Sequence, residues 1–153
     1  MNKITLNLGD IKQLCDEING SVNTENGMVY YEGFLNQNIS VLLKYELSEL
    51  GEYLEKEKIK IEKIKDELIL KYGEAGVNGF MLSKFIVEKD IEGNITSKIQ
   101  NPKYELFESE MNKLLSVEKE FEFPNIAKED LIDIGKTKDN YIVLFRLIKK
   151  GTL

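Results

Sequence analysis

The sequence predicts an α+β fold that consists of a long antiparallel helical hairpin, coiled-coil-like in character, a small antiparallel β-sheet and short flanking helices. Two observations predict it. Apolar residues recur at alternating four- and three-residue steps through a stretch long enough for one extended helix, and short runs that alternate apolar and polar residues lie outside that stretch. The apolar seam of the long helix consists of Leu43, Leu47, Leu50, Leu54, Ile61, Ile64 and Leu68, and Glu57 interrupts it.

The composition fits a single domain over residues 1–153. Hydrophobic residues make up 42% of the chain and there are only two prolines, so we expect no long flexible linkers. We expect an N-terminal strand and helix (1–35), the long helix (36–72), a hairpin (80–100), a second helix (102–116), and a strand with a C-terminal helix (117–153). The start lacks the apolar run of a secretory signal, and no segment reaches the roughly 20 apolar residues of a membrane span. We therefore expect a soluble intracellular protein with no membrane contact.

The N-terminal part begins with alternating apolar and polar residues over 3–8, which predicts a half-buried strand. Asp10 is placed to cap the helix that follows, and Asn19-Gly20 marks its end. Asn26-Gly27 predicts a turn, and the apolar residues of 28–34 fit either a short strand or the start of a helix.

The middle of the chain carries clear boundary signals. Gly73 follows the long helix and begins a glycine-rich connection to Gly79. Two apolar runs flank Glu92-Gly93-Asn94, which predicts the hairpin. Asn101-Pro102 begins the second helix, because proline is favoured at the first helical position. Its own short seam consists of Tyr104, Phe107, Met111 and Leu114.

The C-terminal part contains one ambiguity. Acidic and apolar residues alternate from Glu118 to Phe123, which predicts a strand that ends at Pro124. Residues 139–148 fit either a strand or a helix. Thr137 as a cap and Gly151 as a stop favour the helix.

The length of the second helix limits what it can cover. About 15 residues span near 22 Å at helical rise, enough to cover the seam from Leu54 to Leu68. Leu43, Leu47 and Leu50 lie beyond its reach, and either the N-terminal helix or a second copy of the chain could cover them. We expect a homodimer with these three leucines at its interface.

The residue types argue against several kinds of chemistry. There is no histidine, so no Ser–His or Cys–His pair exists, and Cys15 lies on an apolar helix face where a buried small residue is expected. The glycines at 73, 76 and 79 follow a helix and lack the Gly-Lys-Ser/Thr of a phosphate loop. We expect no enzyme activity, no cofactor and no metal site. Acidic residues interleave with the lysines between 56 and 65, so we expect no direct binding of nucleic acid.

Negative charge gathers in one segment. The net charge is −6, and the segment from Glu105 to Asp133 holds nine acids against three lysines, which equals the whole excess. Such a surface repels nucleic-acid phosphates and attracts basic partners. The predicted partner-binding residues are Glu105, Glu108, Glu118, Glu120, Glu122, Glu129 and Asp130. An alternative is that these acids only keep the protein soluble.

Several predicted elements form one pattern: a long charged helix that ends in Lys-Tyr-Gly-Glu, a hairpin, a second helix, an acidic-apolar strand and a short apolar C-terminus. The residues that carry the pattern are Lys71, Tyr72, Gly73, Glu74, Phe107, Glu110, Leu114, Leu115, Glu118, Phe121, Phe123 and Ile126. In this pattern the chain resembles small proteins encoded in phages and prophages of Gram-positive bacteria. The resemblance covers roughly Leu42 to the end of the chain.

The resemblance implies a phage accessory protein in the cytoplasm of a bacterial host. We expect a non-enzymatic, protein-binding inhibitor of a host defence system, with anti-CRISPR inhibition as one form, that acts through an acidic or helical surface. A virion-assembly protein, a chaperone or a minor structural protein is the alternative.

Overall fold

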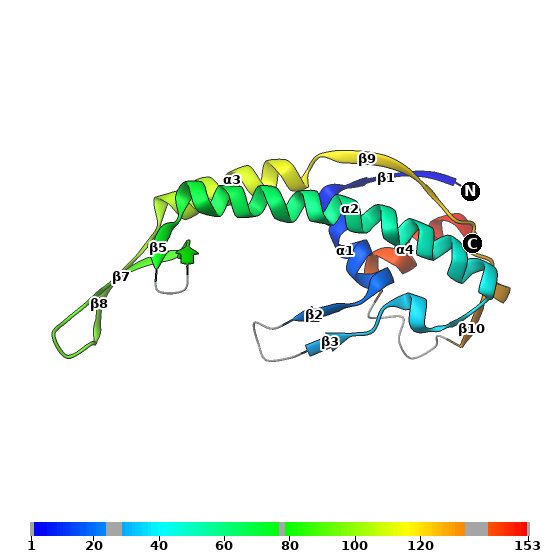
Figure 1. The fold of residues 1–153 in the computed structure, drawn as a ribbon, viewed down its shortest axis with the longest axis horizontal. Helices are drawn as coiled ribbons and strands as arrows, with labels where there is room; N and C mark the ends of the chain where they lie inside the picture. Colours follow the sequence, from blue (N-terminus) through cyan, green and yellow to red (C-terminus); the bar gives the residue numbers. More distant parts are fainter. Residues whose placement is uncertain (1, 24–28, 77–78, 134–140, 153) are drawn as a thin grey trace. The chain divides into compact units, whose positions relative to one another are not determined.

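The computed structural model describes residues 2–23, 29–76, 79–133 and 141–152 (Figure 1). The chain divides into two compact units. Unit 1 comprises Met1–Ile59 and Val117–Leu153, and unit 2 comprises Lys60–Ser116. The described residues form four α-helices and five two-stranded antiparallel sheets, which confirms the α+β class.

Unit 1 begins with strand β1 (Asn2–Asn7), which runs directly into helix α1 (Leu8–Asn19). Asn7 caps α1, because its Oδ1 accepts a hydrogen bond from the Asp10 N–H at 2.7 Å. Asp10, predicted as the cap, lies in the first turn instead, since no loop separates the strand from the helix. Gly20 ends the helix at φ 84°, a value that favours glycine.

Strand β1 pairs with β9 (Glu118–Phe123) in antiparallel register, with Asn2 opposite Phe123 and Asn7 opposite Glu118. The short elements of unit 1 are β2 (Ser21–Asn23), β3 (Val29–Tyr31), the 3-10 helix η1 (Phe34–Asn36), β4 (Asn38–Ile39), η2 (Lys128–Asp130) and β10 (Leu131–Asp133). Strand β2 pairs with β3 and β4 pairs with β10. The predicted turn at Asn26-Gly27 lies outside the described residues.

The long helix α2 runs from Val41 to Tyr72 and ends where the sequence predicts, but it begins later than residue 36. Residues before it belong to η1 and β4, and Ile39 pairs with Leu131. Ser40 then occupies the capping position, since its Oγ accepts a hydrogen bond from the Leu43 N–H at 3.3 Å.

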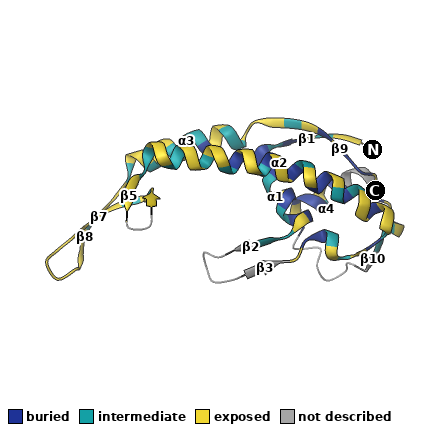
Figure 2. Ribbon diagram, viewed as in Figure 1, coloured by how far each residue is buried: buried dark blue, intermediate teal, exposed yellow. Residues whose placement is uncertain are grey.

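The N-terminal half of the seam lies inside unit 1 (Figure 2). Leu43, Leu47 and Leu50 are 2%, 0% and 6% exposed in the single chain. Helix α1 approaches α2 closely, because Asn19 Nδ2 donates to the Gly51 carbonyl at 3.1 Å and a side chain at Gly51 would collide with Asn19. The single chain therefore covers the three leucines, and the reason for expecting a dimer interface at them is removed.

Glu57, the residue that interrupts the seam, is buried and paired. The residue is 5% exposed, and its Oε1 lies 2.8 Å from Lys119 Nζ on β9. Lys119 points to the same face of β9 as the buried Phe121 and Phe123. The hydrogen bond to Glu57 raises the pKa of Lys119. Glu57 therefore interrupts the apolar seam of α2 at the position where Lys119, which points inward from β9, forms an ion pair with this helix.

Helix α4 (Ile142–Thr152) confirms the helical alternative for the C-terminal part. Its start is capped by a residue distant in sequence: Glu17 of α1 accepts hydrogen bonds from the N–H groups of Val143 and Leu144 at 3.3 Å and 3.0 Å. Phe34 of η1 packs edge-on against Tyr141 and Phe145. The predicted cap Thr137 lies outside the described residues.

Unit 2 contains the end of α2, two hairpins and helix α3 (Pro102–Leu115). The hairpins are β5 (Glu74–Gly76) with β6 (Gly79–Met81), and β7 (Phe85–Lys89) with β8 (Ile95–Gln100). The predicted 80–100 hairpin is present as β7 and β8. The segment predicted as a plain connection, 73–79, instead pairs Glu74 to Gly76 with Gly79 to Met81. Gly73 is required because a side chain there would meet the carbonyl oxygens of Ile69 and Met81.

Helix α3 begins as the sequence predicts, with Asn101 as its cap and Pro102 in its first turn. It contacts the last turn of α2, where Tyr72 Oη donates to Glu110 Oε1 at 3.1 Å and Lys71 Nζ lies 3.8 Å from the same oxygen. Met111 is buried, whereas the other residues of its short seam are only half-buried. The coiled-coil-like packing of the two helices stays a prediction.

Candidate functional site

The hairpins of unit 2 carry a set of exposed apolar residues that we call the hairpin surface. Figure 2 colours most of β7 and β8 as exposed. It consists of Phe80, Met81, Ile86, Val87, Ile91, Ile95 and Ile99. Ile86 and Ile99 lie directly opposite each other on β7 and β8 and are 45% and 59% exposed. Side chains opposite each other in an antiparallel pair lie on one face, so the two isoleucines form one apolar contact area.

The arrangement of apolar residues on the strands explains why they are exposed. A two-stranded hairpin has two faces, and β7 and β8 carry apolar side chains on both of them. Burial of all these side chains would require a covering layer on each face. The buried apolar residues in the described part of unit 2 are Ile61 and Met111, both of which lie on helices. The hairpins therefore contribute no fully buried apolar side chain among these residues.

An apolar groove of about 570 Å³ lies at the base of the hairpins. Met81, Leu82, Phe85 and Ile86 line its strand side, and Pro102 of α3 lies at its other side. Its charged groups are Glu74 and Lys103, whose Oε1 and Nζ atoms are 3.9 Å apart. The volume and the lining suit apolar side chains with a charged group near them.

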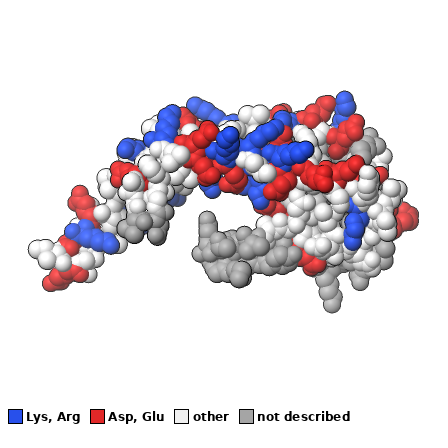
Figure 3. Space-filling view, viewed as in Figure 1, with Lys and Arg blue, Asp and Glu red and all other residues white. Residues whose placement is uncertain are grey.

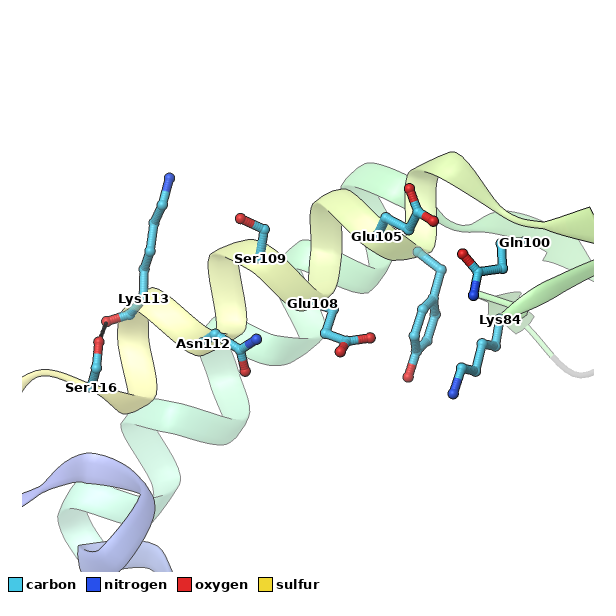
Figure 4. Close-up of a pocket in the computed structure, with 9 residues that line it drawn as sticks. Lys84, Gln100, Glu105, Glu108, Ser109, Asn112, Lys113 and Ser116 are labelled. Carbon is cyan, nitrogen blue, oxygen red and sulfur yellow. Dashed lines mark hydrogen bonds between the residues drawn. The ribbon is translucent and has the colours of Figure 1, made fainter.

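A second groove of about 680 Å³ runs along α3 (Figure 4). Glu105 and Glu108 stand toward the end of α3 where Gln100 of β8 and Lys84, which directly precedes β7, also lie. Figure 4 shows Lys113 and Ser116 at the opposite end of the helix, where Ser116 Oγ donates to the Lys113 carbonyl at 2.9 Å. Two of the predicted partner-binding acids therefore line a polar groove in unit 2.

The other predicted partner-binding acids belong to unit 1. Glu118, Glu120 and Glu122 stand on the exposed face of β9, where Lys3 Nζ lies 3.6 Å from Glu120 Oε1. Glu129 is exposed. On the face shown in Figure 3, acidic and basic side chains are interspersed.

Asp130 accepts hydrogen bonds that stabilise the fold of unit 1. Its Oδ1 accepts a hydrogen bond from Ser40 Oγ at 2.7 Å, and its Oδ2 accepts one from the Ala127 N–H at 3.0 Å. The first bond joins η2 to the residue that precedes α2, and the second is local to η2. The structure therefore divides the predicted acidic set between two units and gives one member a role in the fold.

Cys15 is buried, as the sequence predicts, and 1% exposed. Its Sγ donates a hydrogen bond to Glu55 Oε2 at 3.1 Å. Burial, with the nearby Glu55 carboxylate, raises the pKa of the thiol to about 12, so the thiol stays protonated near neutral pH. This environment is the opposite of the one that activates a nucleophilic cysteine.

Among the described residues, no three or more Asp, Glu or Cys side chains are placed together to hold a metal ion. In the same part of the chain, no helix combines the length and the apolar character that crossing a membrane requires. The titratable groups with shifted pKa values in the core of unit 1, such as Cys15 and Glu17, have hydrogen-bond partners.

Sequence reasoning missed the hairpin surface. The signal was present, because β7 carries apolar residues at both odd and even positions, so neither face of the hairpin can be entirely polar. No family model matches the chain, and comparisons with curated proteins and with solved structures found no match either.

Proposed function

We propose that this protein acts by binding another protein through the hairpin surface, and not by catalysis. The observation that carries the proposal is the exposure of Ile86 and Ile99, which lie opposite each other on a hairpin. Contiguous exposed apolar side chains on a folded chain mark interaction sites, because water contact with them is unfavourable.

The surroundings of the hairpin surface support this proposal. Interfaces combine an apolar centre with a polar rim. Within unit 2, the charged residues Lys84, Glu105 and Glu108 line the groove along α3, and Lys84 directly precedes β7. The two glutamates favour a partner that offers basic side chains at the rim.

For the partner, we propose a host defence complex in the bacterial cytoplasm, as the resemblance to phage accessory proteins implies, with anti-CRISPR inhibition as one form. The second candidate is a phage protein under assembly, with this chain as chaperone or minor structural component. The exposed hairpin favours this candidate too, because a chaperone shields apolar segments of its client with apolar segments of its own.

The test is capture of partners from phage-infected host cells by the tagged chain, followed by binding measurements with the purified partner. Ile86→Ser with Ile99→Ser should raise the dissociation constant about tenfold or more, since both side chains are exposed and the fold does not need them. The matched control is Glu118→Gln with Glu120→Gln on β9, which should bind like the wild type.

The identity of the partner decides between the two candidates. A nuclease or surveillance complex supports defence inhibition, and a tail or capsid protein supports assembly. Equal affinity of the double serine variant and the wild type would contradict binding through the hairpin surface. Loss of binding in the β9 variant alone would indicate that the partner binds the acidic face of β9 in unit 1 and not the hairpin surface.

A further inference from the structure

Among the strands that the structure describes, β7 has a partner along one edge only, which is β8. In an antiparallel pair, residues alternate between those whose N–H and C=O face the partner strand and those whose groups face away. At one end of β7, the Asn101 N–H donates to the Lys84 carbonyl at 2.9 Å, and at the other the Asp90 N–H donates to the Asn94 carbonyl at 2.9 Å. The even-numbered residues of the strand therefore face β8.

The odd-numbered residues of β7 face the other way. The backbone N–H and C=O groups of Phe85, Val87 and Lys89 form a free edge, and in the part of the chain that the structure describes no other strand pairs with it. Val87 is 39% exposed. An unpaired edge with an apolar residue at its centre invites a further strand.

We propose that this edge pairs with β7 of a second copy, antiparallel and about a two-fold axis beside Val87. In this register Val87 lies opposite Val87 of the second copy, and Phe85 lies opposite the second copy's Lys89. All three outward residues then exchange backbone hydrogen bonds, which is the spacing that an antiparallel ladder requires. A register displaced along the strand would leave part of the free edge unpaired.

The side chains support the same register. Lys84 comes opposite Asp90 of the second copy at both ends of the paired region, so opposite charges meet. The ammonium group of Lys89 comes opposite the Phe85 ring, an attractive arrangement of a cation and an aromatic face. Within one chain, Lys98 already uses this interaction, with its Nζ 4.2 Å from the Phe85 ring centroid.

The free edge of β8 is the competing choice, and its charge pattern opposes it. The outward residues of β8 include Lys98, because Lys98 lies opposite the outward-facing Val87. Pairing β8 with its copy along its full length would place Lys98 opposite Lys98. Like charges directly opposite each other destabilise a sheet. The pattern therefore selects β7.

The pairing of two copies would stabilise the hairpin by enlarging its sheet. A lone two-stranded hairpin is marginally stable in water, and a sheet of four strands is not subject to the same limit. The apolar pair of Ile86 and Ile99 stays on the face of the combined sheet, so each copy keeps its contact area for another protein. This self-association goes beyond the proposed function and does not depend on it.

Proline substitution tests the edge. Val87→Pro removes an N–H that faces away from β8, so it leaves the hairpin's own ladder intact and blocks the pairing of two copies. Lys98→Pro is the matched control, since it removes an outward N–H from the other edge. In sedimentation at micromolar concentration the wild type and Lys98→Pro should be dimers, and Val87→Pro should be a monomer.

A cross-link tests the register without disturbing the fold. Hydrogen-bonded residues opposite each other have Cα atoms about 5.5 Å apart, within the range that a disulfide spans. Val87→Cys should therefore give a covalent dimer on oxidation, and Lys98→Cys should not. Cys15 is buried and does not compete. A monomeric wild type, a dimeric Val87→Pro variant, loss of the dimer in both proline variants, or equal cross-linking at both positions would overturn the proposal.

Discussion

Glu17 is a carboxylate on α1 that is buried at the start of α4, with 4% of its surface exposed. Burial raises its pKa above the ordinary value of 4.5, although hydrogen bonds from the backbone N–H groups of Leu144 and Val143 act in the opposite direction. The hydrogen bond with Gln13 and the charge of Arg146 also lower it. The net effect is a folded state that holds the proton of this group more tightly than the unfolded chain does.

The raised pKa predicts how stability depends on pH. A group whose pKa is higher in the folded state contributes stability that is fully present below pH 4.5 and is lost as the pH rises through the raised value. Glu17→Gln should remove this contribution and flatten the pH dependence of the unfolding free energy. Urea unfolding at a series of pH values measures it. Glu122→Gln, an exposed change on β9, is the control, and identical slopes for wild type and Glu17→Gln would contradict the prediction.

Sequence reasoning at the residue scale succeeded where the cause was local. Cys15 lies three to four residues from other apolar positions of α1, so its burial follows from helical periodicity. The roles of Glu57 and Glu17 could not be predicted in this way. Their partners, Lys119 and the start of α4, are distant in sequence, and no local pattern connects them.

At the scale of elements, Asn101 holds the start of α3 with both ends of its amide. Its Oδ1 accepts a hydrogen bond from the Lys103 N–H at 3.1 Å, and its Nδ2 donates to the Ser83 carbonyl at 2.8 Å. The first bond caps the helix, and the second fixes the segment that leads into β7. One side chain therefore orders a helix and a strand together.

Replacement of this cap should loosen both elements. Asn101→Ala should lower the free energy of unfolding by about 1 kcal/mol, since loss of an N-cap costs this much in general. Asn101→Asp keeps the cap and loses only the bond to Ser83, so its loss should be smaller. Chemical unfolding followed by circular dichroism compares the two. Equal losses would show that the bond to Ser83, and not the cap, stabilises this region.

Element boundaries were predictable where a stop signal is local. Tyr72 as the end of α2 and Asn101 as the cap of α3 follow from glycine, asparagine and proline chemistry. The start of α2 was not, because Ile39 is drawn into a strand by its pairing with Leu131. The helical state of α4 has a similar origin, since Glu17 of α1 satisfies the first N–H groups of a segment that is also good strand sequence.

At the scale of the whole molecule, the two units differ in how much apolar surface they bury. The core of unit 1 includes Ile11, Leu14, Phe34, Leu47 and Leu144, each 0% exposed. In the described part of unit 2 only Ile61 and Met111 are buried. The sequence did not reveal this difference, because the exposed residues of the hairpins are as apolar as those of a core.

The difference predicts uneven protection of backbone amides. Amides of α1, which lies in the core of unit 1, should exchange with solvent much more slowly than those of the β5–β6 pair, because opening a hairpin with exposed faces disrupts little packing. Hydrogen exchange followed by mass spectrometry measures both. Comparable protection of the two segments would mean that the hairpin is stabilised by contacts not visible in its own unit.

Charge distribution was also a question that the linear sequence could not answer. Nine acids between Glu105 and Asp133 look like one patch when they are read along the chain. The boundary between the units falls at Ser116 and Val117, so the segment contributes Glu105 and Glu108 to one unit and the face of β9 to the other. The acidic residues of this segment, although close in sequence, therefore belong to two different units.

The ion pair between Glu57 and Lys119 favours one alignment of β9 on the long helix α2 over others. Leucines alone would accept an apolar strand or helix at several positions along the seam, since hydrophobic contact has no direction. Glu57 is a buried residue, 5% exposed, and its carboxylate favours an alignment that brings Lys119 Nζ to within 2.8 Å of it. A foreign helix or displaced strand laid on α2 at this position would break that ion pair, and loss of one partner of a buried pair costs free energy.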